Sequence, residues 1–150
     1  MILVGETNPY GADPAMALFP YPEHSAGGRL CRKILGLRPA TYVQFTRYNL
    51  CTERWAVPAA RHSVLVILTR HGSEDGTVLV LLGRKVASAF GASHLPPFST
   101  WDCALNDLRV GVVLLPHPSG RCRLWNEPGA VERARALMQR EFPHVPFGEA

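Results

Sequence analysis

The fold is decided by the stretch Val110-Gly111-Val112-Val113-Leu114-Leu115-Pro116-His117-Pro118-Ser119-Gly120-Arg121-Cys122-Arg123, where an apolar run passes directly into a polar, basic loop. The apolar run has the length of a buried strand, and the prolines around His117 stiffen the loop that follows. In open α/β folds, ligands bind outside the carboxyl ends of the strands. We therefore expect the functional site at this loop.

Apolar runs and helical spacing elsewhere predict a sheet whose strands alternate with helices. Proline and serine between residues 92 and 101 indicate a loop, and three prolines break up residues 12–28. Strands interleaved with helices predict a parallel sheet with helices on both faces. The expected fold is an α/β three-layer αβα sandwich with a small four-stranded parallel sheet, with strands at 1–5, 41–46, 77–82 and 110–115 and helices within 28–35, 58–68, 83–90 and 128–142.

The size and composition fit one globular domain that spans residues 1–150. Hydrophobic residues make up 47% of the chain and charged residues 19%, and a chain of this length buries roughly 70% of its unfolded surface. The formal net charge of +4 suits a polyanionic partner without requiring one.

Cysteine usage and hydropathy bear on metals and compartment. The four cysteines, at positions 31, 51, 103 and 122, stand singly and lack the paired spacing of zinc or iron–sulfur sites, so we expect no metal. No apolar run approaches the roughly 18 residues of a membrane span, and no signal-like segment opens the chain. We expect a cytoplasmic protein without a membrane partner.

Two loops, each after an apolar strand and about a hundred residues apart, carry a family resemblance. They read Gly5-Glu6-Thr7-Asn8-Pro9-Tyr10-Gly11 and His117-Pro118-Ser119-Gly120. In this order they resemble the two motifs of the uracil-DNA glycosylase superfamily, with the single-strand-selective monofunctional and mismatch-specific branches nearest. Residues 81–90 and Asn49-Leu50-Cys51 are similar to segments between those motifs, although the first loop has one residue more than the usual pattern before Asn8.

The resemblance implies a monofunctional DNA glycosylase of base excision repair. Such an enzyme flips uracil or a related pyrimidine out of single- or double-stranded DNA and hydrolyses its N-glycosidic bond, leaving an abasic site. It implies no cofactor, and we expect a monomer.

The catalytic roles implied by the resemblance fall on Asn8 and His117. Asn8 would orient the attacking water, and His117 would donate a hydrogen bond to the oxygen of the departing base. Glu6 competes with Asn8 for the water because of the extra residue. The Asn8-Pro9 pair also fits a plain turn, since both residue types favour turns.

The base-binding candidates are Tyr10, Phe19 and Asn49. The amide of Asn49 has the donor and acceptor that the O4 and N3–H edge of uracil requires, and Phe19 could stack on the flipped base. Arg47 competes with Asn49 as base reader. Asn49 also fits a strand cap, and Phe19 also fits a core position.

The DNA-binding candidates follow His117 directly. Ser119 and the amides around Gly120 would hold a phosphate, while Arg121 and Arg123 would follow the strand or fill the gap left by the base. The two arginines also fit a solvated charge pair. Trp125 reads as a core anchor for the last helix.

Two other functions remain open. One is an enzyme of the same kind that acts on a modified base or a free nucleotide. The other is a DNA-binding relative without catalysis, which would bind DNA in a salt-sensitive way and release no base.

Overall fold

Five strands form one sheet in the structure, a computed structural model that describes residues 1–149. The strand order is β2-β1-β3-β5-β4. Neighbours are parallel except for β4, which runs antiparallel to β5 at one edge. The strands are β1 (Ile2–Thr7), β2 (Thr46–Cys51), β3 (Val78–Leu82), β4 (Ser99–Leu105) and β5 (Leu108–Leu115).

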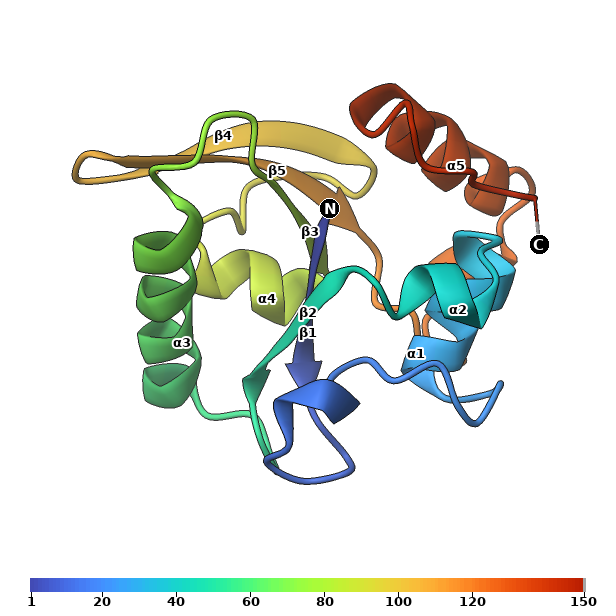
Figure 1. Ribbon diagram of the computed structural model, residues 1–150, viewed down its shortest axis with the longest axis horizontal. Coiled ribbons are helices and arrows are strands. Elements are labelled where there is room, and N and C mark those ends of the chain that lie inside the picture. Colours follow the sequence, from blue (N-terminus) through green and yellow to red (C-terminus); the bar gives the residue numbers. More distant parts are fainter. Residues whose placement is uncertain (150) are drawn as a thin grey trace.

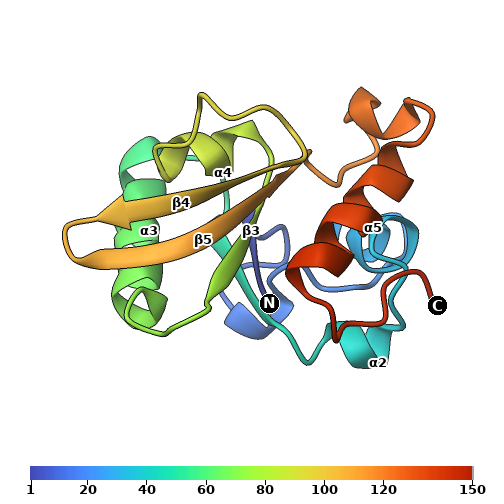
Figure 2. The same ribbon diagram turned by 90° about the horizontal axis from the view of Figure 1, so that it is seen from above.

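Helices lie on both sides of this sheet, with α3 and α4 on one side and α1, α2 and α5 on the other (Figure 1). The view from above gives the same separation of α3 and α4 from α2 and α5 (Figure 2). The helices are α1 (Ala26–Gly28), which continues as the π-helix η2 (Arg29–Ile34), then α2 (Pro39–Tyr42), α3 (Val57–His71), α4 (Arg84–Ala89) and α5 (Ala130–Glu141), with short 3₁₀ turns η1 (Pro14–Met16) and η3 (Arg123–Asn126).

The central strands are buried on both faces. Successive side chains of a strand point to opposite sides, and each side is covered by helices. In β1, Leu3 joins a buried cluster with η2 and α5, whereas its neighbour Val4 joins a second cluster with α3 and α4. Val112 and Val113 in β5 divide between the two clusters in the same way. The continuous apolar runs of the sequence are therefore explained by burial on two sides.

The expected sheet of four parallel strands is wrong in number and direction, because the predicted loop at 92–101 ends in a strand. β4 begins at Ser99, reverses at a tight turn and pairs with the whole of β5, from Ser99 opposite Leu114 to Leu105 opposite Leu108. Its pattern is weak because most of its residues are at least partly exposed, as on an edge strand.

The expected strand at 41–46 is also wrong. Pro39 occupies the first turn of α2, where its missing N–H costs nothing, and the helix ends at Tyr42. The Tyr42 ring is fully buried, and its hydroxyl donates to the carbonyl of Leu18 over 2.8 Å. The strand β2 starts only at Thr46, where pairing with Ile2 of β1 begins.

The remaining predicted elements are confirmed with shifted ends. The first strand extends to Thr7, and the helix expected at 28–35 begins at Ala26, ends at Ile34 and has π-helical bonds over most of its length. The helices expected after Pro58, after Gly83 and after Pro128 correspond to α3, α4 and α5. In residues 1–149, every helix is too short or too polar to cross a membrane.

Candidate active site

Three parallel strands end side by side and bring the two motif loops to one edge of the sheet. Leu82 at the end of β3 lies opposite Leu115 at the end of β5, and Val4 of β1 lies opposite Leu81. Glu6 near the end of β1, Gly83 after β3 and His117 after β5 therefore follow one another across this edge. The backbone N–H of Gly83 donates to the carbonyl of Leu115 over 2.9 Å, which joins the residue after β3 to the end of β5.

Glu6 and His117 face each other across Gly83. The Oε2 atom of Glu6 lies 3.9 Å from Nε2 of His117, too far for a hydrogen bond but close enough for mutual electrostatic influence. A Cβ on Gly83 would lie 3.1 Å from Cβ of His117 and 3.4 Å from Oε1 of Glu6. Gly83 also has φ of +100°, so a glycine both permits the backbone and leaves room for the pair.

The backbone and one ring nitrogen of His117 are fixed by its own loop. The backbone N–H of Ser119 donates to Nδ1 over 3.1 Å, and Nε1 of Trp125 donates to the carbonyl of His117 over 2.8 Å. Because Nδ1 accepts, a neutral ring carries its proton on Nε2, the nitrogen that faces Glu6. The buried Trp125 thus anchors the last segment of the chain and also holds His117.

Burial lowers the pKa of His117 from its ordinary value of 6.5. The carboxylate of Glu6 opposes that decrease, and the ammonium group of Lys85 adds to it. A neutral imidazole therefore dominates at neutral pH, and it presents one N–H donor at Nε2.

Asn8 lies in a tight turn that uses both ends of its side-chain amide. Its Oδ1 accepts from the backbone N–H of Tyr10 over 2.9 Å, and its Nδ2 donates to the carbonyl of Asp13 over 3.2 Å. The residue is 5% exposed, and its backbone N–H donates to Cys51 at the end of β2. These contacts match the turn interpretation of this residue.

Asn49 differs, because its amide is buried and neither Oδ1 nor Nδ2 has a hydrogen-bond partner. A Cβ on Gly5 would lie 2.6 Å from Oδ1 of Asn49 and 2.9 Å from Cδ2 of Leu18, so the amide sits against the bare backbone of β1. Nε and Nη1 of Arg47, two residues earlier on the same face of β2, are also buried without partners, while Nη2 donates to Ala15.

Two separate cavities divide the expected site residues. Asn8, Arg47 and Asn49 line a cavity of about 270 Å³ at the outer edge of β2. His117 and Gly83 line another of about 240 Å³, together with Arg84, Leu95, Pro97, Leu114, Leu115, Pro116, Cys122 and Leu124. The structure therefore brings Glu6, not Asn8, next to His117.

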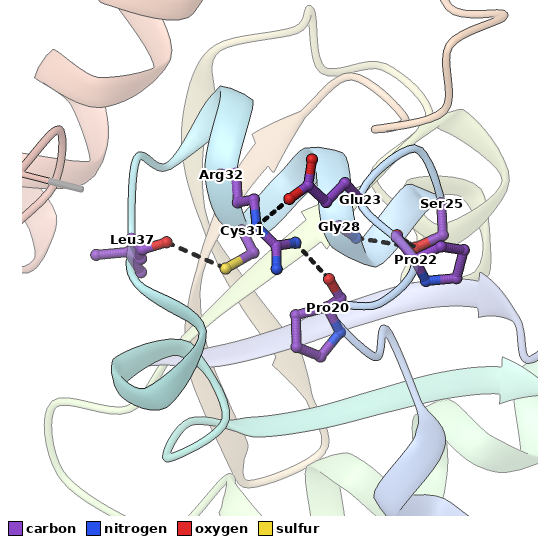
Figure 3. Close-up of polar contacts among 8 residues, drawn as sticks. All are labelled: Pro20, Pro22, Glu23, Ser25, Gly28, Cys31, Arg32 and Leu37. Carbon is purple, nitrogen blue, oxygen red and sulfur yellow. Dashed lines mark hydrogen bonds and ion pairs between the residues drawn. The ribbon is translucent and has the colours of Figure 1, made fainter.

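Aromatic side chains gather in the segment that leads to η2. The rings of Phe19 and Tyr21 lie 5.9 Å apart, and the hydroxyl of Tyr10, itself 43% exposed, contacts the carbonyl of Tyr21 over 3.4 Å. Arg32 holds this segment, because its Nη1 donates to the carbonyl of Pro20 (Figure 3). Its guanidinium also lies 4.6 Å from the Tyr21 ring centre. Tyr10 and Phe19 thus both contact Tyr21, Phe19 through its ring and Tyr10 through its hydroxyl.

The expected DNA-binding residues lie where the sequence places them, directly after His117. Gly120, Arg121 and Arg123 are exposed, and Ser119 is partly exposed. Within residues 1–149, neither arginine has a carboxylate close enough to form an ion pair. The loop therefore presents uncompensated positive charge beside the Glu6–His117 pair.

Two residues that hold the site were missed from the sequence. Tyr42 fixes Leu18 through its hydroxyl, and Arg29 donates from Nε to the carbonyl of Pro118 over 3.1 Å. Both contacts join distant parts of the chain, so no local pattern indicates them. Gly83 does have a local signal, since a glycine directly after an apolar strand is typical of a sharp turn.

No three His, Cys, Asp or Glu side chains in residues 1–149 are grouped as metal ligands would be. Comparison with protein-family models finds no match, and no curated protein matches the chain.

Proposed function

We propose that this protein is a DNA glycosylase that flips uracil or a related pyrimidine out of DNA and hydrolyses its N-glycosidic bond. We also propose that its fold is the three-layer αβα sandwich of the uracil-DNA glycosylase superfamily. The observation that carries the proposal is the Glu6–His117 pair, which faces across Gly83 at the carboxyl edge of a parallel sheet. The two loop motifs of the sequence support the same reaction.

The reaction breaks the bond between C1′ of the sugar and N1 of the base. The bonding electrons leave with the base, whose negative charge spreads onto its oxygens, and the sugar becomes cationic. Nε2–H of neutral His117 can stabilise such an oxygen as a pre-placed donor. Because the Nδ1 atom already accepts from Ser119, the donor needs no rearrangement before the reaction.

Glu6 is the residue we assign to the water. Its carboxylate can stabilise the sugar cation and accept a proton as the water oxygen bonds to C1′, and the proton then passes to the released base. An amide could orient water but is a poor base, and the amide of Asn8 is already bonded at both ends. Asn8 then supports the loop, and Glu6 acts on the substrate.

Base recognition is assigned to Asn49, with Phe19 and Tyr10 as stacking surfaces. Because Asn49 and His117 line separate cavities, the base would have to lie over the end of β1, between these two side chains. The unpartnered amide of Asn49 offers one donor and one acceptor, which match O4 and N3–H of uracil. A buried amide without protein partners costs about 1–3 kcal/mol, and a ligand that completes its bonds would remove this cost, which supports the assignment. Cytosine offers the opposite pattern.

DNA binding is assigned to Ser119, Gly120, Arg121 and Arg123. The exposed arginines supply charge for the phosphates on either side of the flipped nucleotide. The reaction as proposed uses no metal or other cofactor.

A modified pyrimidine is a second candidate substrate. Arg47 lies two residues from Asn49 on the same face of β2, and its Nε and Nη1 are buried without acceptors. A base with an additional oxygen would supply an acceptor for these groups, which uracil alone does not.

The test is incubation of the purified protein with single- and double-stranded oligonucleotides that contain one uracil, followed by alkaline cleavage at abasic sites. Oligonucleotides with oxygen-bearing modified pyrimidines form a second set. We expect cleavage by the wild-type protein and not by Glu6→Gln. Uncleaved oligonucleotides of both sets, together with salt-sensitive binding, would identify a DNA-binding protein without catalysis and would overturn the proposal.

A further inference from the structure

Arg29 connects the first turn of η2 to the loop that carries His117. Its Nε donates to the carbonyl of Pro118 over 3.1 Å, a contact between residues 89 positions apart. The backbone of Arg29 is itself fixed, since its N–H donates to the carbonyl of Ser25 over 2.8 Å. The side chain is therefore held from both ends.

The guanidinium of Arg29 lies flat beside Gly120. A Cβ placed on Gly120 would be 3.8 Å from each of Cζ, Nε and Nη1 of Arg29, so the plane of the guanidinium lies across that position. The N–H groups lie in this plane and point past Gly120. The side chain thus borders the same exposed loop residues that we assign to DNA.

The terminal nitrogens of Arg29 have no partner in the part of the chain that the structure describes. Neither Nη1 nor Nη2 donates a hydrogen bond, and neither is among the buried unpartnered atoms, so each nitrogen of this half-buried side chain keeps some exposure to solvent. No carboxylate forms an ion pair with this arginine within residues 1–149. A held guanidinium with two open nitrogens and no counter-charge is suited to a phosphate oxygen.

The surroundings keep the positive charge of Arg29 uncompensated. It lines a cavity of about 340 Å³ with Glu23, His24, Gly28, Arg32 and Lys33. Glu23, the one acid in that lining, lies 3.7 Å from Nε of Arg32, which also holds Pro20 (Figure 3). The acid is therefore engaged with a different arginine.

We propose that Arg29 binds a phosphodiester of the DNA strand beside Ser119 and Gly120, and that the same side chain holds Pro118 and so positions His117. Arg29 would then both bind the DNA strand and help to place His117, the proposed hydrogen-bond donor. This inference rests on the proposed function for its ligand, the DNA strand, but its test does not require base release.

The test measures binding of a uracil-free single-stranded oligonucleotide of about twelve nucleotides at several salt concentrations. A lost phosphate contact lowers the slope of log K against log salt by about 0.7 for single strands. For Arg29→Gln we expect affinity about tenfold weaker and the slope lower by that amount. Arg29→Lys keeps the charge and should keep the slope. Arg61→Gln, an exposed arginine of α3 on the other side of the sheet, should change neither quantity.

Three results would overturn the inference: Arg29→Gln binds like wild type, it binds more weakly with an unchanged slope, or inorganic phosphate competes as well as the oligonucleotide does. An altered slope in a protein that releases no base would support the inference while the proposed function fails. Base release with an unaltered slope in Arg29→Gln would separate the two in the opposite direction.

Discussion

The first and last loops of the site both begin where a buried strand ends, but they differ in which polar groups are free. In the first loop, the amide of Asn8 is bonded at both ends within its own turn. In the last loop, Nδ1 and the carbonyl of His117 are bonded, and Nε2 faces Glu6 without a hydrogen bond. The comparison indicates that Asn8 builds the loop, whereas Glu6 and His117 are available to a substrate.

The largest effect is expected for Glu6→Gln, which removes the proposed base and keeps the size of the side chain. General base catalysis contributes about 10²–10⁴-fold, so we expect a rate loss in that range with little change in stability. Single-turnover cleavage of a uracil oligonucleotide measures the rate. Glu53→Gln, an exposed site just after β2, is the control and should behave like wild type. Full activity in Glu6→Gln would contradict this role of Glu6 and would assign the attacking water to Asn8 instead.

His117→Ala removes the proposed donor to the departing base. Loss of one such donor costs about 10²–10³ in rate, so the same assay should show a decrease of that size. The bond from Trp125 goes to the backbone carbonyl and remains, so the loop should keep its place. His62→Ala on the exposed side of α3 serves as the matched control. Equal rates in the two variants would rule out the role of His117.

Asn8→Ala should affect stability more than chemistry. It removes the two hydrogen bonds that the side chain makes to the N–H of Tyr10 and the carbonyl of Asp13, which together contribute about 1–3 kcal/mol to the free energy of unfolding. Urea unfolding measures this loss, and single-turnover rates at a temperature where the variant is folded should lie within several-fold of wild type. A fully stable variant that lost its activity would contradict the turn assignment.

Asn49→Ala is the matched comparison for Asn8→Ala. The amide of Asn49 has no partner to lose, so the free energy of unfolding should decrease less than in Asn8→Ala. The preference for uracil over cytosine should fall, because the donor and acceptor that distinguish them are gone. Relative cleavage of the two bases and urea unfolding test both points. An unchanged preference for uracil over cytosine would contradict the role of Asn49 and would assign base recognition to Arg47 instead.

The smallest effect is on the titration of His117. Its pKa in the folded protein lies below the ordinary value of 6.5 that applies to the unfolded chain. At a pH between the two pKa values, the unfolded chain binds a proton that the folded chain does not. The contribution of His117 to the free energy of unfolding is therefore fully present above about pH 6.5, and it is lost as the pH decreases toward the pKa of the folded protein. Nuclear magnetic resonance should show a midpoint below 6.5, lower still in Glu6→Gln and higher in Lys85→Met, with Glu74→Gln as an unaffected control.

Much of the fold could be predicted because burial on two faces leaves long apolar runs, as in residues 77–82 and 110–115. The strand β4 could not, since an edge strand with Trp101 and Asp102 partly or fully exposed has no such run. The start of β2 also escaped prediction. Residues 41–46 have β-forming side chains, but the proline before them starts a helix and pairing with β1 decides the register.

For the candidate site, the sequence predicted at which strand ends its residues lie, but not which of their side chains are free to contact a substrate. Parallel strands bring their carboxyl ends to one edge, which is why Asn8, with Glu6 as its competitor, could be named together with His117. The choice between Glu6 and Asn8 depends on which side chain its own turn occupies, and this requires hydrogen bonds that spacing does not show. Arg29 escaped for a similar reason, because its contact with Pro118 joins distant segments.

The antiparallel edge strand has a consequence for how this site can diversify. Because β4 runs back along β5, the segment before it returns to the edge with His117, where Leu95 and Pro97 form one wall of the cavity. That wall therefore belongs to the segment that connects α4 with the edge strand β4. Glu6, Gly83 and His117 are not part of this segment. Surface connections tolerate insertions better than core strands do. Lengthening residues 91–98 would reshape the cavity beside His117, while the parallel strands, Glu6 and His117 keep their places.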